Sequence, residues 1–169
     1  MKEMVKLGVR LMLFALIASL LLALTYAITK EPIQEQKLRA AMQTRVAVLP
    51  GDENFTQVYE GTGEIESIFQ SSQGYVFSVR TQGYGSGGVL VTVGLANAGE
   101  ITGVRVDASG ETPGLGAKAG TEAFYGQFSG KTVDNALDVD AISGATITTN
   151  AVKKAVELAV DYAKENFGL

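Results

Sequence analysis

The chain has 169 residues, 46% of them hydrophobic and 19% charged, a composition typical of a folded protein with one modest domain and an attachment segment. The formal net charge is −4, and so acidic a chain is not expected to bind nucleic acid. Cysteine and histidine are both absent, which excludes thiolate and imidazole metal sites, iron–sulfur clusters and Ser-His-Asp or Cys-His catalysis. A redox role would therefore need an organic cofactor or a metal site made of carboxylates alone.

The first feature along the chain is an uncharged apolar run from Leu11 to Ile28. With Leu7 to Val9 it is long enough to cross a bilayer as a helix, and Arg10 and Tyr26 stand where head-group contacts and interfacial aromatics belong. A cleaved signal peptide is the main alternative, since residues 25–27 carry small side chains at cleavage-like positions. The length of the run and the charged residues after it favour an uncleaved, single-pass anchor.

Basic residues flank this run on both sides, so the charge count leaves the orientation open. Three precede the run and four follow it, namely Lys2, Lys6 and Arg10, then Lys30, Lys37, Arg39 and Arg45. Because the first group adjoins the span, we predict a cytoplasmic N-terminus and an extracytoplasmic C-terminal domain.

A second helix is predicted after the span. Pro32 suits the first turn of a helix, and apolar residues recur at helical spacing as far as Val46. Pro50-Gly51-Asp52 ends this pattern. The sequence therefore predicts three parts: an N-terminal tail and transmembrane helix over residues 1–29, a membrane-proximal helix over residues 30–50, and an extracytoplasmic domain over residues 51–169.

The rest of the chain has mainly strand-like alternation. Gly74–Thr81, Val89–Leu95 and Glu100–Asp107 are the clearest strands, and Ala96–Gly99 joins the last two as an antiparallel hairpin. Other expected elements are a strand or turn at residues 55–59 and at 65–69, a helix holding Thr121–Phe128, a short strand at Asp134–Asp140 and a C-terminal amphipathic helix ending near Phe167. The predicted fold class is α+β: a twisted antiparallel sheet with helices on one side.

Two loops are rich in glycine, at residues 82–88 and at residues 110–118. Pro113-Gly114 in the second loop is a turn signal, and Gly116 permits close approach of the backbone to a planar ligand. An ordinary loop that leads into a helix explains the same residues.

The stretch from Asp140 to Asn150 concentrates four hydroxyl side chains directly before the C-terminal helix: Ser143, Thr146, Thr148 and Thr149. Such residues commonly cap helices, and Thr148 or Thr149 is the expected cap here. The free amides of a helix start, expected at residues 148–150, also suit an anionic phosphate. Gly144 and Ala145 leave space around Thr146, and a left-handed turn at Gly144 would expose its hydroxyl.

The order of these features resembles the membrane-anchored FMN-binding subunits of bacterial respiratory complexes. The apolar span, the ETPGLGAK loop at residues 111–118 and DAISGAT at residues 140–146 are most similar to the G subunit of the Rnf complex, an ion-translocating ferredoxin:NAD oxidoreductase. The C subunit of the sodium-translocating NADH:quinone oxidoreductase is the alternative relative. The resemblance covers nearly the whole chain, and its specific part runs from Gly83 to the last helix.

This resemblance implies that FMN is attached to Thr146 through a phosphoester bond, installed by a flavin transferase that uses FAD and a divalent metal. It places the second loop at the isoalloxazine ring, with Leu115 on the ring face and Thr112 at its polar edge. The cofactor-binding residues it implies are Glu111, Thr112, Gly114, Leu115, Gly116, Lys118, Ser143, Gly144, Ala145, Thr146, Thr148 and Thr149. Ser109 stands where many members have a histidine, which leaves the role of that position open.

The same resemblance implies an electron-transfer subunit in a bacterial cell membrane, with other subunits of the complex as partners and no stand-alone catalysis. Two other function classes remain open. One is an anchored binding module without a cofactor. The other is a carboxylate-based hydrolase that uses Glu111, Asp138 and Asp140, although the spacing of these residues in the sequence does not support a shared site. No catalytic or metal-ligating residue is predicted.

Overall fold

The computed structural model describes residues 2–169, which divide into two compact units, residues 2–41 and residues 42–169. The first unit lies wholly within helix α1 (Lys2–Val48). Its apolar side chains are exposed, and an 18-residue window of this helix has a mean hydropathy of 2.5, so α1 is long and apolar enough to cross a membrane.

Helix α1 is continuous through Pro32, so the separate helix predicted to begin there is not separate. Val48 and Leu49, at and just beyond its end, are fully buried beside Phe69 and Val76. The compact unit that holds the sheet therefore includes the last two turns of α1, from Met42 onward.

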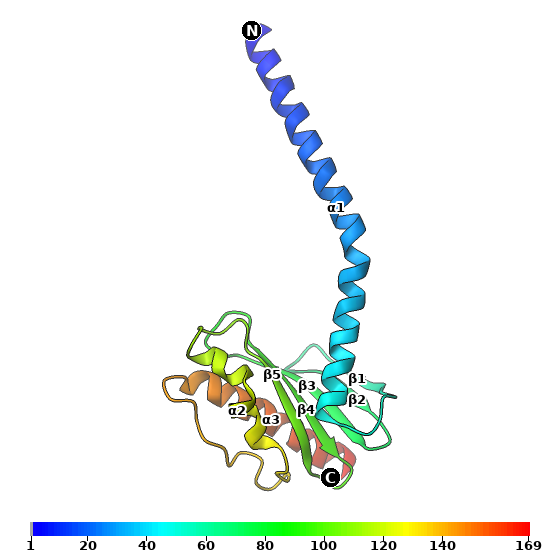
Figure 1. Ribbon diagram of the computed structural model, residues 1–169, viewed down its shortest axis with the longest axis vertical. Helices are drawn as coiled ribbons and strands as arrows, with labels where there is room; N and C mark the ends of the chain where they lie inside the picture. Colours follow the sequence, from blue (N-terminus) through cyan, green and yellow to red (C-terminus); the bar gives the residue numbers. More distant parts are fainter. Residues whose placement is uncertain (1) are drawn as a thin grey trace. The chain divides into compact units, whose positions relative to one another are not determined.

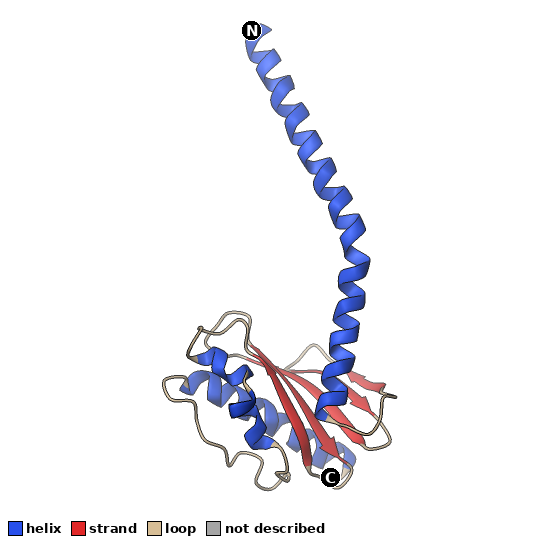
Figure 2. Ribbon diagram, viewed as in Figure 1, coloured by secondary structure: helices blue, strands red, loops and turns tan. Residues whose placement is uncertain are grey.

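The second unit is built on one antiparallel sheet of five strands in sequential order (Figures 1 and 2). The strands are β1 (Thr56–Glu60), β2 (Ile65–Gln70), β3 (Gly74–Thr81), β4 (Val89–Ala96) and β5 (Ile101–Asp107). The segments at 55–59 and 65–69 are therefore strands, and the hairpin predicted at Ala96–Gly99 is confirmed by a hydrogen bond of 2.9 Å from the Gly99 N–H to the Ala96 carbonyl. The predicted fold class is confirmed.

The C-terminal helix α3 (Thr146–Phe167) covers one face of this sheet (Figure 1). Alternation along β3 and β4 directs Phe77, Val91 and Val93 to that face, where Ala155 and Val160 of α3 meet them in the main core. On the same side lie the short helices η1 (Gly116–Gly120), α2 (Glu122–Tyr125) and η2 (Gly126–Phe128). Helices α2 and η2 replace the single helix predicted over Thr121–Phe128.

Two predictions about secondary structure are wrong, one about a strand and one about the start of a helix. The strand expected at Asp134–Asp140 is a series of turns, because the Asn135 side chain accepts the Thr132 N–H at 2.8 Å, and Thr132 makes only an isolated bridge to Glu100. Helix α3 begins at Thr146 rather than near Thr148, and its cap position, Ala145, makes no side-chain cap.

The loop between α1 and β1 is fixed by the carboxylate of Asp52, a half-buried residue. It accepts the Asn54 N–H at 2.8 Å, and the N–H and hydroxyl of Ser72 at 3.0 and 2.7 Å. These hydrogen bonds, led by that from Asn54, lower the pKa of Asp52 to about 2 from an ordinary 3.8.

We expect Asp52→Asn to destabilise the domain in a pH-dependent manner. Because the folded-state pKa is depressed, the carboxylate stabilises the fold above the unfolded pKa of 3.8, and this contribution is lost as pH falls through about 2. Thermal unfolding of the full chain in detergent at pH 7, 4 and 2 should give a lower Tm for the variant at pH 7 and a much smaller difference at pH 2. An equal difference at all three pH values would contradict this account.

Candidate functional site

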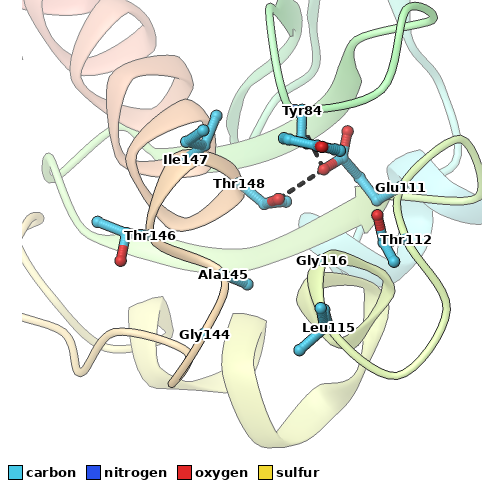
Figure 3. Close-up of a pocket in the computed structure, with 10 residues that line it drawn as sticks. All are labelled: Tyr84, Glu111, Thr112, Leu115, Gly116, Gly144, Ala145, Thr146, Ile147 and Thr148. Atoms are coloured by element: carbon cyan, nitrogen blue, oxygen red, sulfur yellow. Dashed lines mark hydrogen bonds between the residues drawn. The ribbon is translucent and has the colours of Figure 1, made fainter.

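Three segments that are distant in sequence line one cavity of about 500 Å³ (Figure 3). They are the loop after β3, the loop between β5 and η1, and the stretch that leads into α3. The lining residues are Tyr84, Glu111, Thr112, Leu115, Gly116, Gly144, Ala145, Thr146, Ile147 and Thr148. A cavity of this size suits a cofactor-sized ligand.

The cavity has an apolar part and a polar part. Tyr84, Leu115 and Ile147 are 71%, 44% and 55% exposed, although large apolar side chains are normally buried. Side chains of this kind around a cavity can receive a planar ring. The polar part holds Thr112 and the buried pair Glu111 and Thr148, in which the Thr148 hydroxyl donates to the Glu111 carboxylate at 2.5 Å.

The four hydroxyls before and within the first turn of α3 have different environments. The Thr148 hydroxyl is buried and bonded to Glu111, and the buried Thr149 hydroxyl donates to the Ala145 carbonyl at 3.0 Å and accepts the Ile142 N–H at 3.1 Å. Neither caps the helix, so the predicted capping role of these two residues is wrong. Thr146 and Ser143 are exposed, and only Thr146 of these two lines the cavity.

Thr146 is the first residue of α3, a 22-residue helix. The amides of Thr146, Ile147 and Thr148 precede the first intrahelical bond, which the Thr149 N–H donates to the Ala145 carbonyl at 2.9 Å. The free amides of the helix start are therefore at residues 146–148 rather than at the predicted 148–150. They lie at the positive end of the helix dipole, which favours an anion at this edge of the cavity.

Gly144 makes the sharp turn that brings Thr146 to the cavity. Its φ of +77° is in the left-handed region, as the sequence predicted for this position. The turn is closed by a hydrogen bond of 3.0 Å from the Ala145 N–H to the Ile142 carbonyl. In Figure 3 the Thr146 side chain points away from Glu111, while Thr148 points toward it.

The cavity brings together most, but not all, of the predicted cofactor-binding residues. Predicted residues outside its lining are Gly114, Lys118, Ser143 and Thr149. Tyr84 and Ile147 line it without having been predicted. The glycine-rich sequence around Tyr84 was a usable signal, since it marks a loop that packs closely against another segment.

The three carboxylates of the hydrolase alternative are not gathered at one site. Glu111 lines the cavity described here, whereas Asp138 lines a separate one beside Asp134 and Glu157. Asp140 lines neither of these two cavities.

Comparison with known proteins identifies both parts of the chain. Residues 83–161 match the model of the FMN-binding domain, and residues 1–48 match the model of the RnfG N-terminal region. The match to the FMN-binding domain begins at the loop that carries Tyr84 and ends within α3, so it includes all the segments that line the cavity.

Three relatives that match over most of the chain are each named as the G subunit of an ion-translocating oxidoreductase complex. The chain is 33% identical to the G subunit of the ion-translocating oxidoreductase complex of Aliivibrio fischeri, over 91% of this chain and 87% of that protein. It is 32% identical to the G subunit of the Na⁺-translocating ferredoxin:NAD⁺ oxidoreductase complex of Acetobacterium woodii, over 94% and 91%. It is also 32% identical to the G subunit of the ion-translocating oxidoreductase complex of Methanosarcina acetivorans, over 99% and 98%. The chain therefore belongs to the RnfG family, the G subunits of Rnf-type ion-translocating oxidoreductase complexes, as a membrane-anchored electron-transfer subunit with an FMN-binding domain.

Proposed function

We propose that this subunit holds FMN covalently, as a phosphoester on Thr146, and relays electrons through it. The single observation that carries this proposal is the position of Thr146. Its exposed side chain lines the cavity at the start of α3, next to three amides that the helix leaves unbonded. The other hydroxyls of this stretch are either buried and hydrogen-bonded or outside the cavity lining.

The residues present fit a phosphate-linked flavin. The helix start suits the phosphodiester, which keeps one negative charge. The apolar side chains of Leu115, Ile147 and Tyr84 suit the faces of the ring, and the Thr112 side chain suits a polar edge. FMN supplies the one- or two-electron chemistry, while the protein holds and orients it.

A separate flavin transferase is expected to form the bond. The Thr146 oxygen would bond to the phosphorus of the FMN half of FAD as the pyrophosphate bond breaks, with AMP leaving and the hydroxyl proton passing to the transferase. A threonine hydroxyl is a weak nucleophile without a base. The lack of a side chain at Gly144, where an added Cβ would crowd Leu115 at 3.3 Å, supports access for such an enzyme.

A covalent bond also suits the proposed location. We propose a cytoplasmic N-terminus and a C-terminal domain outside the cell membrane, where no FMN pool replaces a lost cofactor. Electrons would then pass between this flavin and redox centres in other subunits of the complex. The names of the relatives, which describe subunits of a larger oxidoreductase, support such partners.

The proposal is tested by expressing the full chain with and without a flavin transferase. We expect a yellow protein that keeps its flavin fluorescence in a denaturing gel only when the transferase is present. Colour that is lost on denaturation would indicate FMN bound without an ester. A colourless protein of unmodified mass from cells with an active transferase would instead favour the anchored module without a cofactor.

A further inference from the structure

We propose that Glu111 is a positioning residue whose buried carboxylate assembles the ring cavity before any ligand binds and supplies a fixed negative charge that lowers the reduction potential of the flavin. This inference rests on the proposed FMN site and extends it to the regulation of the cofactor. It changes the role expected from the sequence, in which Glu111 was simply one residue of the ring-contacting loop.

The Glu111 carboxylate connects all three segments of the cavity. One oxygen accepts the Gly85 N–H at 2.9 Å, and the other accepts the Tyr84 N–H at 3.2 Å and the Thr148 hydroxyl at 2.5 Å. We call these four residues the Glu111 cluster. The loop after β3, the loop after β5 and the first turn of α3 are therefore joined at one side chain that is only 3% exposed (Figure 3).

The glycines around Glu111 indicate that the backbone is shaped to accommodate this carboxylate. A Cβ added at Gly116 would lie 2.6 Å from the Thr148 hydroxyl oxygen and 2.8 Å from Glu111 Oε2, and one added at Gly83 would overlap Glu111 Oε1. Contacts this short do not occur for real side chains, so the space at both glycines is already filled by the Glu111 cluster. The cluster is thus a built feature of the cavity wall.

The carboxylate is kept ionised. Burial by itself raises the pKa of Glu111, but hydrogen bonds from the Thr148 hydroxyl and from the Gly85 and Tyr84 amides outweigh that effect and place the pKa below its ordinary value. Because no cation is paired with Glu111 in the part of the chain that the structure describes, its charge is compensated only by neutral donors. The cavity therefore contains one net negative charge at neutral pH.

This charge acts on the redox equilibrium of a flavin in the same cavity. Reduction adds negative charge to the isoalloxazine ring, and a nearby anion in a partly buried site disfavours that change. Glu111 should therefore hold the potential lower than a neutral side chain of the same shape would. Such a shift suits a carrier that must pass electrons onward rather than retain them.

The assembly step is tested first on the full chain without flavin, expressed without a transferase and placed in detergent. In amide hydrogen exchange, we expect the Tyr84 and Gly85 amides to exchange more slowly than those of Ser86 and Gly87 in the same loop, and about tenfold faster in Glu111→Ala than in wild type. Equal rates at all four amides of the wild-type protein would overturn the role of Glu111 in assembly. This wild-type measurement does not depend on any variant folding.

The charge is tested by redox titration of the flavinylated full chain. At the midpoint potential of the wild-type protein, the ratio of reduced to oxidised flavin should be about tenfold higher in Glu111→Gln than in wild type, because the neutral side chain no longer opposes reduction. Glu111→Asp, which keeps the charge, should remain near wild type, and so should Glu122→Gln, which removes a charge on the exposed side of α2. An unchanged midpoint in Glu111→Gln, or an equal shift in Glu122→Gln, would overturn the electrostatic role.

These outcomes are distinct from failure of the proposed function. If Thr146 is not the flavin acceptor, the protein lacks an ester-linked flavin while the exchange pattern at Tyr84 and Gly85 is unaffected. If Glu111 does not have the proposed role, the protein is flavinylated normally, and either the exchange pattern or the midpoint potential differs from expectation.

Discussion

Thr146→Val is expected to abolish covalent flavin retention completely while leaving the fold intact. Valine has nearly the shape of threonine but lacks the oxygen that would bond to the phosphorus. The side chain is exposed, so its replacement should change the free energy of unfolding by no more than about 0.5 kcal/mol. Fluorescence in a denaturing gel, after expression with the transferase, measures the retained flavin directly.

Two neighbouring hydroxyls provide matched controls. Ser143→Ala removes an exposed hydroxyl outside the cavity lining and should retain full fluorescence. Thr148→Val removes the donor to Glu111 and should cost about 1–3 kcal/mol of stability, because a buried carboxylate loses a hydrogen bond, yet the flavin should remain attached. A fluorescent Thr146→Val protein, or loss of fluorescence in Ser143→Ala alone, would show that the acceptor has been assigned to the wrong residue.

Gly94→Val is expected to have the largest effect on stability, about 3 kcal/mol. Gly94 of β4 pairs with Gly103 of β5, and the chain at Val48 lies directly on this pair. A Cβ at Gly94 would lie 2.6 Å from the Val48 carbonyl carbon, and the Thr102 hydroxyl donates to the carbonyl oxygen of the same residue. Valine would displace the end of α1 from the sheet and break this hydrogen bond.

The effect can be measured by chemical unfolding of the full chain in detergent. Gly63→Ala is the control, because an added Cβ there meets nothing within 4 Å, and it should remain within about 0.5 kcal/mol of wild type. Neither glycine has a positive φ, so the comparison separates lack of space from conformational strain. Similar stabilities for the two variants would mean that the end of α1 does not depend on contact with the sheet.

The sheet could be predicted from sequence because its strands follow a two-residue period. Gly74–Thr81 alternates in sequence, and Val89–Leu95 has valine at every second position as far as Val93. Both strands pack against α3. The segment at residues 134–140 alternates as well, yet it forms turns, because the Asn135 side chain bonds to the backbone and the neighbouring Thr132 makes only a single bridge, to Glu100. Local alternation does not reveal whether a segment has a pairing partner.

The packing of the end of α1 on the sheet could not be predicted from the sequence for a different reason. Periodicity up to Val46 predicted where a helix lies, but the residues that pack on the sheet are Val48 and Leu49, just before the proline. Their burial depends on the bare backbone at Gly94 and Gly103, which are distant in sequence. No pattern within the helix itself carries that information.

Most residues that line the cavity could be named from the sequence, but the contacts among them could not. The loop at residues 111–116 and the stretch before α3 do meet at one cavity, as the family resemblance implied. The sequence could not show that Thr148 and Glu111 bond to each other, because the two residues are joined only by the fold. For the same reason the cap was assigned to Thr148 or Thr149, whose hydroxyls are in fact used elsewhere.

The most direct test of the account is peptide mapping by mass spectrometry of the wild-type chain, purified from cells that contain an active flavin transferase. We expect the added mass of one FMN, less water, on the peptide that contains residues 140–150, with fragment ions that place it on Thr146. An unmodified peptide, or FMN on Ser143, Thr148 or Thr149, would contradict the account.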